Sequence, residues 1–162
     1  MILTTTKPLI DVSRLKPVHR ERIQLWCDTL RNSGDRYPKG DKVIRDINDC
    51  YCVMGVACDI SKLGQWQYYQ RSESQKDYLK ECYIYSTGDT RDDWHYGALP
   101  TSVFEWYGFH FADTSPYVND NNVLVIDPND STALVNISYL NDIYGFTFAQ
   151  IADTLELSYL QK

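Results

Sequence analysis

Apolar residues recur at helical spacing in four separate segments of the chain, and this periodicity restricts the possible folds more than any other feature of the sequence. The clearest segment is the last one, where the spacing is i, i+3, i+4 and i+7 at Phe148, Ile151, Ala152 and Leu155. Thr147 and Gln150 stand at its start and match the S/T-x-x-E/Q capping box. The pattern predicts further helices over 18–31, 53–63 and 99–107.

Each predicted helix has one apolar side, and these sides must be buried against one another in a shared core. Pro17 suits the first turn of the first helix, and Gly34 suits its end. Gly55 lies inside the second helix, where glycine costs about 1 kcal/mol relative to alanine, so we expect another backbone segment to approach it closely. The predicted core residues are Ile23, Trp26, Leu30, Val53, Val56, Ile60, Val103, Phe104, Leu140, Phe148, Ile151 and Leu155.

Short strands are predicted in two places. Residues 43–47 and 50–52 alternate around a turn at Asn48 and Asp49, and the apolar runs 123–126 and 133–137 flank a polar loop. Residues 137–144 could instead begin a helix. The sequence therefore predicts an α+β fold, a helix-rich single domain with about four helices and one or two short antiparallel hairpins.

The domain organisation is simple. We expect an extended N-terminal leader over 1–16 and a single globular domain over 17–162. Within this domain, 64–98 is rich in Tyr and Trp and has the weakest periodicity, so it is interpreted as an insertion. A helix over 75–85 and a loop over 86–97 are the expected elements there.

Charge and composition exclude several classes of partner. The net charge is −6 and Lys and Arg form no cluster, so we expect no nucleic-acid partner. No apolar run approaches the ~20 residues that cross a bilayer, so we expect no membrane association. The start of the chain lacks a typical secretion signal, and the five cysteines are odd in number. These features favour a reducing, cytoplasmic location.

The cysteines offer the most chemically specific candidates. Cys50, Cys52 and Cys58 lack the paired C-x₂₋₄-C spacing of zinc sites, so we expect no metal, and no cofactor motif is present. Cys52 immediately precedes the second predicted helix, where a helix N-terminus lowers a thiol pKa. With His95 or His110 as base, Cys52 would be the nucleophile of a hydrolase or transferase. Buried core thiols are the simpler interpretation.

Four blocks of sequence stand out in a fixed order. They are LWCDTLRNSG at 25–34, YCVMGVACD at 51–59, LPTSVFEWYG at 99–108 and LNDIYGFTFAQIAD at 140–153. They resemble a group of small uncharacterised tailed-phage proteins with the pattern W…LRSG, CCLGVACD, LP..V..WLG and LND.G..F..IA. The resemblance implies a phage-encoded accessory role in the host cytoplasm and carries no activity. Here Cys50 and Cys52 flank Tyr51, whereas the pattern has adjacent cysteines.

Asn141 and Asp142 stand just before the capped helix and allow two interpretations. In the first, their side chains bind nearby backbone amides and shape the turn between two helices. In the second, they meet Arg45, Tyr51 and Cys52 and form the polar floor of a ligand or partner site. The blocks named above carry Tyr51, Cys52, Asn141 and Asp142, which is the reason to expect that they meet.

The composition favours a binding protein over an enzyme. Thirteen Tyr, five Phe and four Trp make up 14% of the chain, and Tyr and Trp are enriched at interfaces. We therefore expect a phage accessory protein without catalytic residues that binds a host protein or a small signalling ligand, for example to counter host defence. The alternatives are a Cys52-dependent enzyme and a structural or assembly component of a virion, and a homo-oligomer is compatible with each.

Overall fold

The computed structural model describes residues 10–70, 81–89, 98–110 and 122–161, and this part of the chain contains five helices and two small sheets. In chain order the elements are α1 (Pro17–Arg31), α2 (Val53–Ser61), β1 (Gln65–Gln70), β2 (Glu81–Ser86), α3 (Thr101–Trp106), β3 (Leu124–Asp127), β4 (Asp130–Asn136), α4 (Ile137–Asp142) and α5 (Phe148–Tyr159). Each sheet is a two-stranded antiparallel hairpin. The predicted α+β class is confirmed.

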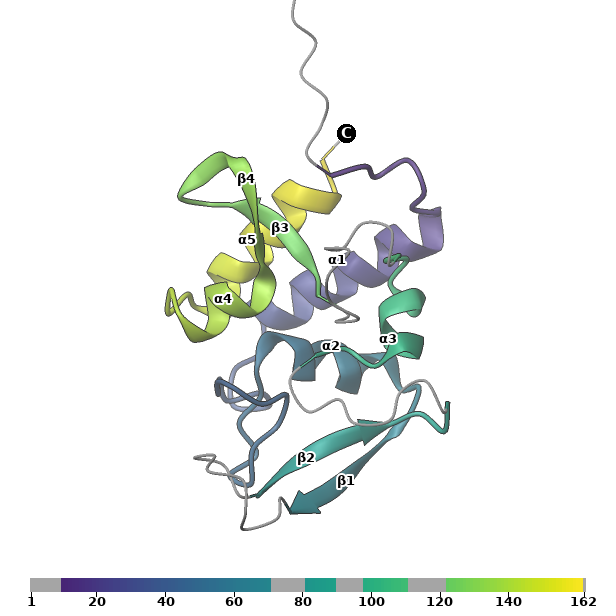
Figure 1. Cartoon of the computed structure of the whole chain (residues 1–162), viewed down its shortest axis with the longest axis vertical. Coiled ribbons are helices and arrows are strands. Elements are labelled where there is room, and N and C mark those ends of the chain that lie inside the picture. Colours follow the sequence, from purple (N-terminus) through teal and green to yellow (C-terminus); the bar gives the residue numbers. More distant parts are fainter. Residues whose placement is uncertain (1–9, 71–80, 90–97, 111–121, 162) are drawn as a thin grey trace, which may run out of the picture.

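Helices α1 and α5 come from opposite ends of the chain and lie side by side (Figure 1). Pro17 is the first residue of α1, as predicted. The predicted capping box of α5 is also confirmed: Gln150 N donates to Thr147 Oγ1 at 3.2 Å, and Thr147 N donates to Gln150 Oε1 at 2.9 Å. Of the twelve predicted core residues eleven are buried, and Ile60 is partly buried against the same core.

Helix α2 lies in the middle of the molecule and buries seven of its nine residues. A Cβ atom on Gly55 would stand 1.8 Å from the carbonyl oxygen of Ile44. The close backbone approach predicted for Gly55 is therefore confirmed. The helix ends at Ser61 rather than at Leu63, because Lys62 turns into the left-handed region (φ 56°) and the Ser61 hydroxyl accepts a hydrogen bond from Leu63 N.

The hairpin predicted near the C-terminus is present as β3 and β4, with a shorter loop than expected because β4 already begins at Asp130. The hairpin packs on α5, where Ile126 N donates to the Ser158 hydroxyl at 2.9 Å and the Tyr159 hydroxyl donates to Leu124 O. The undecided segment after it is helical: α4 starts at Ile137, and the Asn136 side chain caps it by accepting from Ser138 N.

The aromatic-rich hairpin β1–β2 is the part of the fold that the periodicity did not predict. The helix expected over 75–85 is wrong from Glu81 onward, where the chain forms β2, and its earlier residues lie outside the described ranges. The cause is cross-strand pairing, for example the edge-on contact of Tyr68 with Tyr83, which local spacing does not reveal. Of the expected 86–97 loop only 86–89 is described, and Ser86 still belongs to β2.

Two other predicted segments are the strand pair over 43–52 and the N-terminal leader over 1–16. The strand expected over 43–47 is not formed, and only Arg45 in it makes single β-bridges, one to Tyr51 and one to Tyr83. The partner strand expected over 50–52 is likewise absent, and only Tyr51 in it makes such bridges. Of the expected leader, residues 1–9 lie outside the described ranges, and Ile10 and Leu15 in the remainder pack against the core.

No helix in the described ranges is both long and apolar enough to cross a membrane.

Candidate functional site

The five residues that the sequence singled out separate into two groups in the structure. Arg45 and Tyr51 lie together beside the β1–β2 hairpin, with the Arg45 guanidinium carbon 5.4 Å from the Tyr51 ring centroid. Cys52, Asn141 and Asp142 lie at the start of α2. Tyr51 and Cys52 are neighbours in the chain, so the two groups adjoin without forming one polar floor.

At the start of α2, Asn141 is a buried connector between distant segments. Its side-chain oxygen accepts from Val53 N at 3.3 Å, and its amide nitrogen donates to Gly40 O at 2.9 Å and to Asp142 Oδ1 at 2.7 Å. The Asn141 carbonyl in turn accepts from Lys39 Nζ at 3.1 Å. The local-turn interpretation of Asn141 is therefore wrong, because the backbone groups that its side chain binds belong to α2 and to the loop before it, and only Asp142 is a local partner.

Cys52 does not have the properties of an activated nucleophile. The residue is 6% exposed, and burial raises the pKa of its thiol to about 12, although backbone N–H groups of Gly55 and Met54 at the helix start act in the opposite direction. The expected lowering of this pKa is wrong because desolvation outweighs the effect of the helix N-terminus. Of the two histidines considered as its base, His95 lies outside the described ranges and His110 lies near His19 at the start of α1.

All five cysteines lie in the described part of the chain. Each is a thiol outside any disulfide. Within the described ranges, no group of three or more His, Cys, Asp or Glu side chains is arranged to hold a metal ion.

The second group forms a more unusual arrangement, which we call the Arg45 surface and define as Arg45, Tyr51, Trp66, Tyr68 and Tyr83. The Arg45 guanidinium carbon lies 4.3 Å from the Tyr83 ring centroid and 5.3 Å from that of Trp66, in addition to its contact with Tyr51. Tyr68 meets Tyr83 edge-on and is 54% exposed. One arginine therefore stands among three aromatic rings beside an exposed tyrosine.

Backbone and side-chain contacts hold Arg45 in this position. Its carbonyl accepts a hydrogen bond from Tyr83 N at 2.9 Å, which attaches the loop to β2. Its Nε and Nη2 atoms donate to Asp49 Oδ1 at 3.1 and 2.7 Å, and its side chain remains 18% exposed. The guanidinium group is thus held in one orientation by Asp49.

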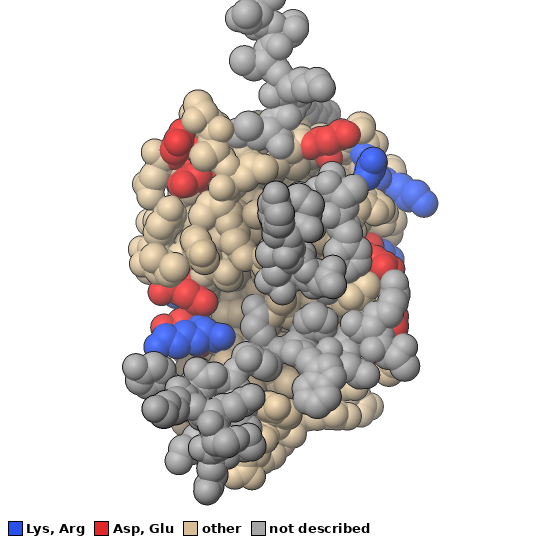
Figure 2. Space-filling model, in the orientation of Figure 1, with Lys and Arg blue, Asp and Glu red and all other residues tan. Residues whose placement is uncertain are grey.

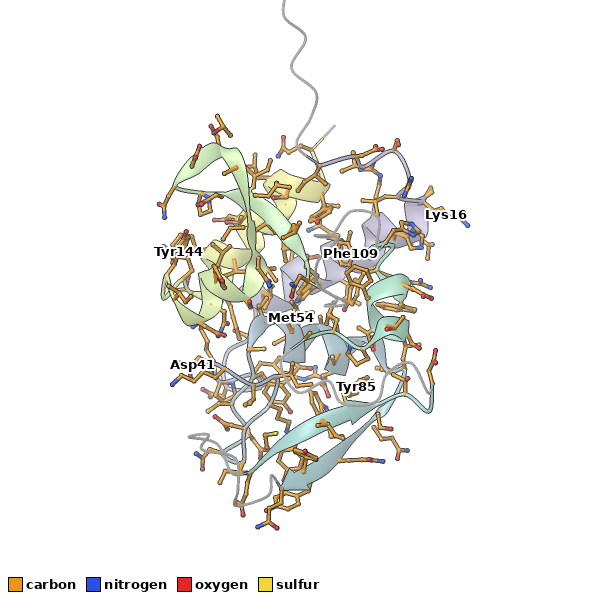
Figure 3. The ribbon with its side chains drawn as sticks, in the orientation of Figure 1. Lys16, Asp41, Met54, Tyr85, Phe109 and Tyr144 are labelled. Carbon is orange, nitrogen blue, oxygen red and sulfur yellow. The ribbon has the colours of Figure 1, made fainter. Side chains whose placement is uncertain are left out.

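A row of edge-on aromatic rings supports the surface from inside. Tyr37, Tyr51, Trp66 and Tyr85 contact one another in that order at centroid distances of 5.0, 5.8 and 5.0 Å. Figure 3 shows Tyr85 between the hairpin and the helices. The Asp59 carboxylate on α2 accepts from the Tyr37 hydroxyl and from Trp66 Nε1, and burial together with this bond raises the pKa of Tyr37. The row attaches the hairpin rigidly to α2.

Sequence reasoning missed Trp66, Tyr68 and Tyr83 as members of this surface, although it noted the aromatic excess of 64–98. The usable signal was the pairing of aromatic residues two positions apart, at Trp66 and Tyr68 and at Tyr83 and Tyr85, which places each pair on one face of a strand.

The charged residues on the face of the molecule drawn in Figure 2 form no large patch of one sign. Lys and Arg are mixed there with Asp and Glu in small groups among uncharged residues.

Comparison with known proteins identifies a family without a known activity. The chain matches no curated protein and no solved structure. The family profile with the description "Domain of unknown function (DUF8296)" matches residues 19–159, a range that includes both hairpins and all of α2, α3, α4 and α5. Because this match covers most of the chain, the protein belongs to the DUF8296 family.

Proposed function

We propose that this protein is a phage-encoded accessory protein that binds a host protein through the Arg45 surface, without catalysis, in the host cytoplasm. The phage origin rests on the resemblance of its four sequence blocks to small tailed-phage proteins. The binding role rests on the arrangement of Arg45 among aromatic rings.

The single observation that carries the proposal is the composition and geometry of this surface. Arg, Trp and Tyr are the residues that most often dominate the binding energy of protein interfaces. Here they are combined in one cluster, with Tyr68 exposed and the Arg45 guanidinium fixed by Asp49. Such a cluster offers a planar cation, ring faces and tyrosine hydroxyls to a partner at little cost in conformational entropy.

The Arg45 surface is elongated, because its residues lie along two paired strands and the loop beside them. Tyr68 and Trp66 lie on β1, Tyr83 on β2 and Arg45 on the preceding loop. An extended arrangement of this kind favours a protein partner over a small signalling ligand, because a small ligand is normally enclosed on most of its surface.

The test is affinity capture from host lysate with tagged wild-type protein and two variants. Arg45→Lys keeps the positive charge but loses the planar group that stacks on the rings, so we expect it to lose the partner. Tyr68→Ala removes an exposed ring and should weaken capture as well. The matched control is Tyr139→Ala, because Tyr139 on α4 is exposed to nearly the same extent as Tyr68 on β1, 50% against 54%, and lies outside the Arg45 surface.

The outcomes distinguish the proposal from its alternatives. A host protein that is captured by wild type and the Tyr139 variant, and lost with both surface variants, supports the proposal. Equal capture by all four proteins contradicts it. A small molecule found in the captured wild-type sample would favour the signalling-ligand alternative, and co-purification with phage particles would favour a virion component.

A further inference from the structure

Among the described residues, none pairs with the outer edge of β1. Within the described ranges β1 pairs with β2 alone, and in Figure 1 β2 lies between β1 and the helices. The outer side of β2 contacts the loop that carries Arg45, because Tyr83 N donates to Arg45 O at 2.9 Å. The loop therefore occupies one side of the hairpin, while the described residues place no strand beside the other.

The sequence of β1 is also unusual for an edge strand. Proteins commonly protect exposed edges with charged residues, proline or a bulge, because unpaired backbone groups attract other strands. The β1 sequence QWQYYQ contains no charge and no proline, and none of the 22 acidic or 16 basic residues of the chain falls within it. Its register with β2 is regular over all six pairs, whereas β3–β4 has an irregularity.

We propose that β1 pairs antiparallel with β1 of a second copy of this chain, which forms a four-stranded sheet across a two-fold axis. Antiparallel pairing of identical edges matches N–H groups to carbonyl groups without any change in the hairpin. The net charge of −6 would oppose association elsewhere on the surface, but β1 brings no like charges together. A second copy is therefore the occupant that this edge fits.

The side chains of β1 are self-complementary in one register. When the axis passes through Gln67, each Gln67 faces its own copy, and Trp66 faces Tyr68 of the second copy. Because Trp66 already pairs with Tyr85 and Tyr68 with Tyr83, two rows of four aromatic residues would then cross the sheet on one face. Opposed aromatic pairs of this kind stabilise neighbouring strands.

The expected association is weak, because one pair of six-residue strands buries less area than a standard stable interface. Sedimentation of the full chain should show a mass that rises with concentration from 18.9 kDa toward twice that value, within the range up to ~1 mM. A monomer throughout this range would overturn the proposal, and so would open-ended aggregation, since a two-fold interface closes at two copies.

Charge exchange at Gln67 tests the register. Gln67 is exposed, so Gln67→Lys and Gln67→Glu should fold as the wild type does, which a thermal melt checks. Each variant alone opposes like charges across the axis and should be monomeric, and an equimolar mixture should dimerise again. Ser131→Lys, on the exposed part of β4, is the control and should dimerise normally.

Dimerisation of the Gln67 variants alone, or failure of the mixture to restore the dimer, would reject this interface. The result is independent of the partner proposed for the Arg45 surface, because it uses purified protein, and the tested residue Gln67 is not a member of that surface.

Discussion

The side-chain oxygen of Asn141 accepts a hydrogen bond from the backbone N–H of Val53, 88 residues earlier in the chain. Asn141 is 2% exposed, and it also donates to Gly40 O. One amide group from α4 thereby satisfies a donor at the start of α2 that the Cys52 side chain does not cap.

We expect Asn141→Ala to lower the free energy of unfolding by about 1–3 kcal/mol, because the buried N–H of Val53 and the partly buried carbonyl of Gly40 both lose a hydrogen bond. Asp142→Ala removes one bond to the same amide from an exposed position and should cost less. Urea denaturation of both variants measures the difference. Equal losses would mean that the contacts to Val53 and Gly40 contribute little.

Gly55→Ala should destabilise the protein although alanine is the better helix former by about 1 kcal/mol. The added Cβ would stand 1.8 Å from Ile44 O, so either the loop or α2 must move, at a cost of about 3 kcal/mol or more. Thr29→Ala, at a partly exposed position of α1, provides the helix-propensity control and should be neutral or slightly stabilising. A stable Gly55→Ala protein would contradict the close approach.

Two leucines of α5 differ in burial, so the same substitution at each position tests the orientation of the helix. Leu155 is 0% exposed and Leu157 is 52% exposed. We expect Leu155→Ala to cost about 2–5 kcal/mol and Leu157→Ala to change the free energy of unfolding by less than about 0.5 kcal/mol. Thermal or urea melts of the pair give the comparison, and similar losses in both would exclude the assigned orientation of α5.

Stability should fall in mildly acidic solution because of His19. Its Nδ1 atom accepts from Lys16 N at 3.1 Å, and desolvation followed by the charges of Arg22, Lys16 and His110 lowers its pKa. Because the folded state favours neutral histidine, this contribution is complete above the ordinary pKa of about 6.5 and is lost as the pH falls toward the lower folded value.

The measurement is the melting temperature of wild type and His19→Gln between about pH 7.5 and 5. Glutamine can accept the same cap hydrogen bond and does not titrate in this range, so its melting temperature should vary less with pH. Parallel curves for the two proteins would show that another group causes the loss.

Thiol labelling should distinguish the cysteines by exposure. Cys50 is partly exposed, whereas Cys52 is 6% exposed and has a pKa of about 12. In native protein near pH 8 we expect slow labelling of Cys50 and none of Cys52, with all five thiols reacting after denaturation. Rapid modification of native Cys52 would revive the Cys-dependent enzyme as a candidate, and Cys52→Ser would then test its activity.

The sequence predicted α1, α2, α3 and α5 because their signals are local. The cap and apolar spacing of α5 lie within nine residues of one another, and the reason for Gly55 follows from helix propensity alone. The β1–β2 hairpin was missed because its exposure does not alternate regularly and its pairing is non-local. Of the five residues that the hypothesis placed in one site, Arg45 and Tyr51 contact each other, whereas the long-range partners of Asn141 could not be inferred from the residues around it.

The pairing of α1 with α5 also bears on when the chain can fold during synthesis. The Cys27 thiol contacts Ala152 O at 3.6 Å, and Arg31 reaches Asp153 at 2.8 Å, so α1 is covered by a helix that is made more than 100 residues later. Until α5 has left the ribosome, the part of the apolar side of α1 that packs on α5 has no cover, and such surfaces attract chaperones or aggregate. Folding is therefore expected to be completed only after translation of this region, and nascent chains arrested before residue 148 should remain sensitive to proteases.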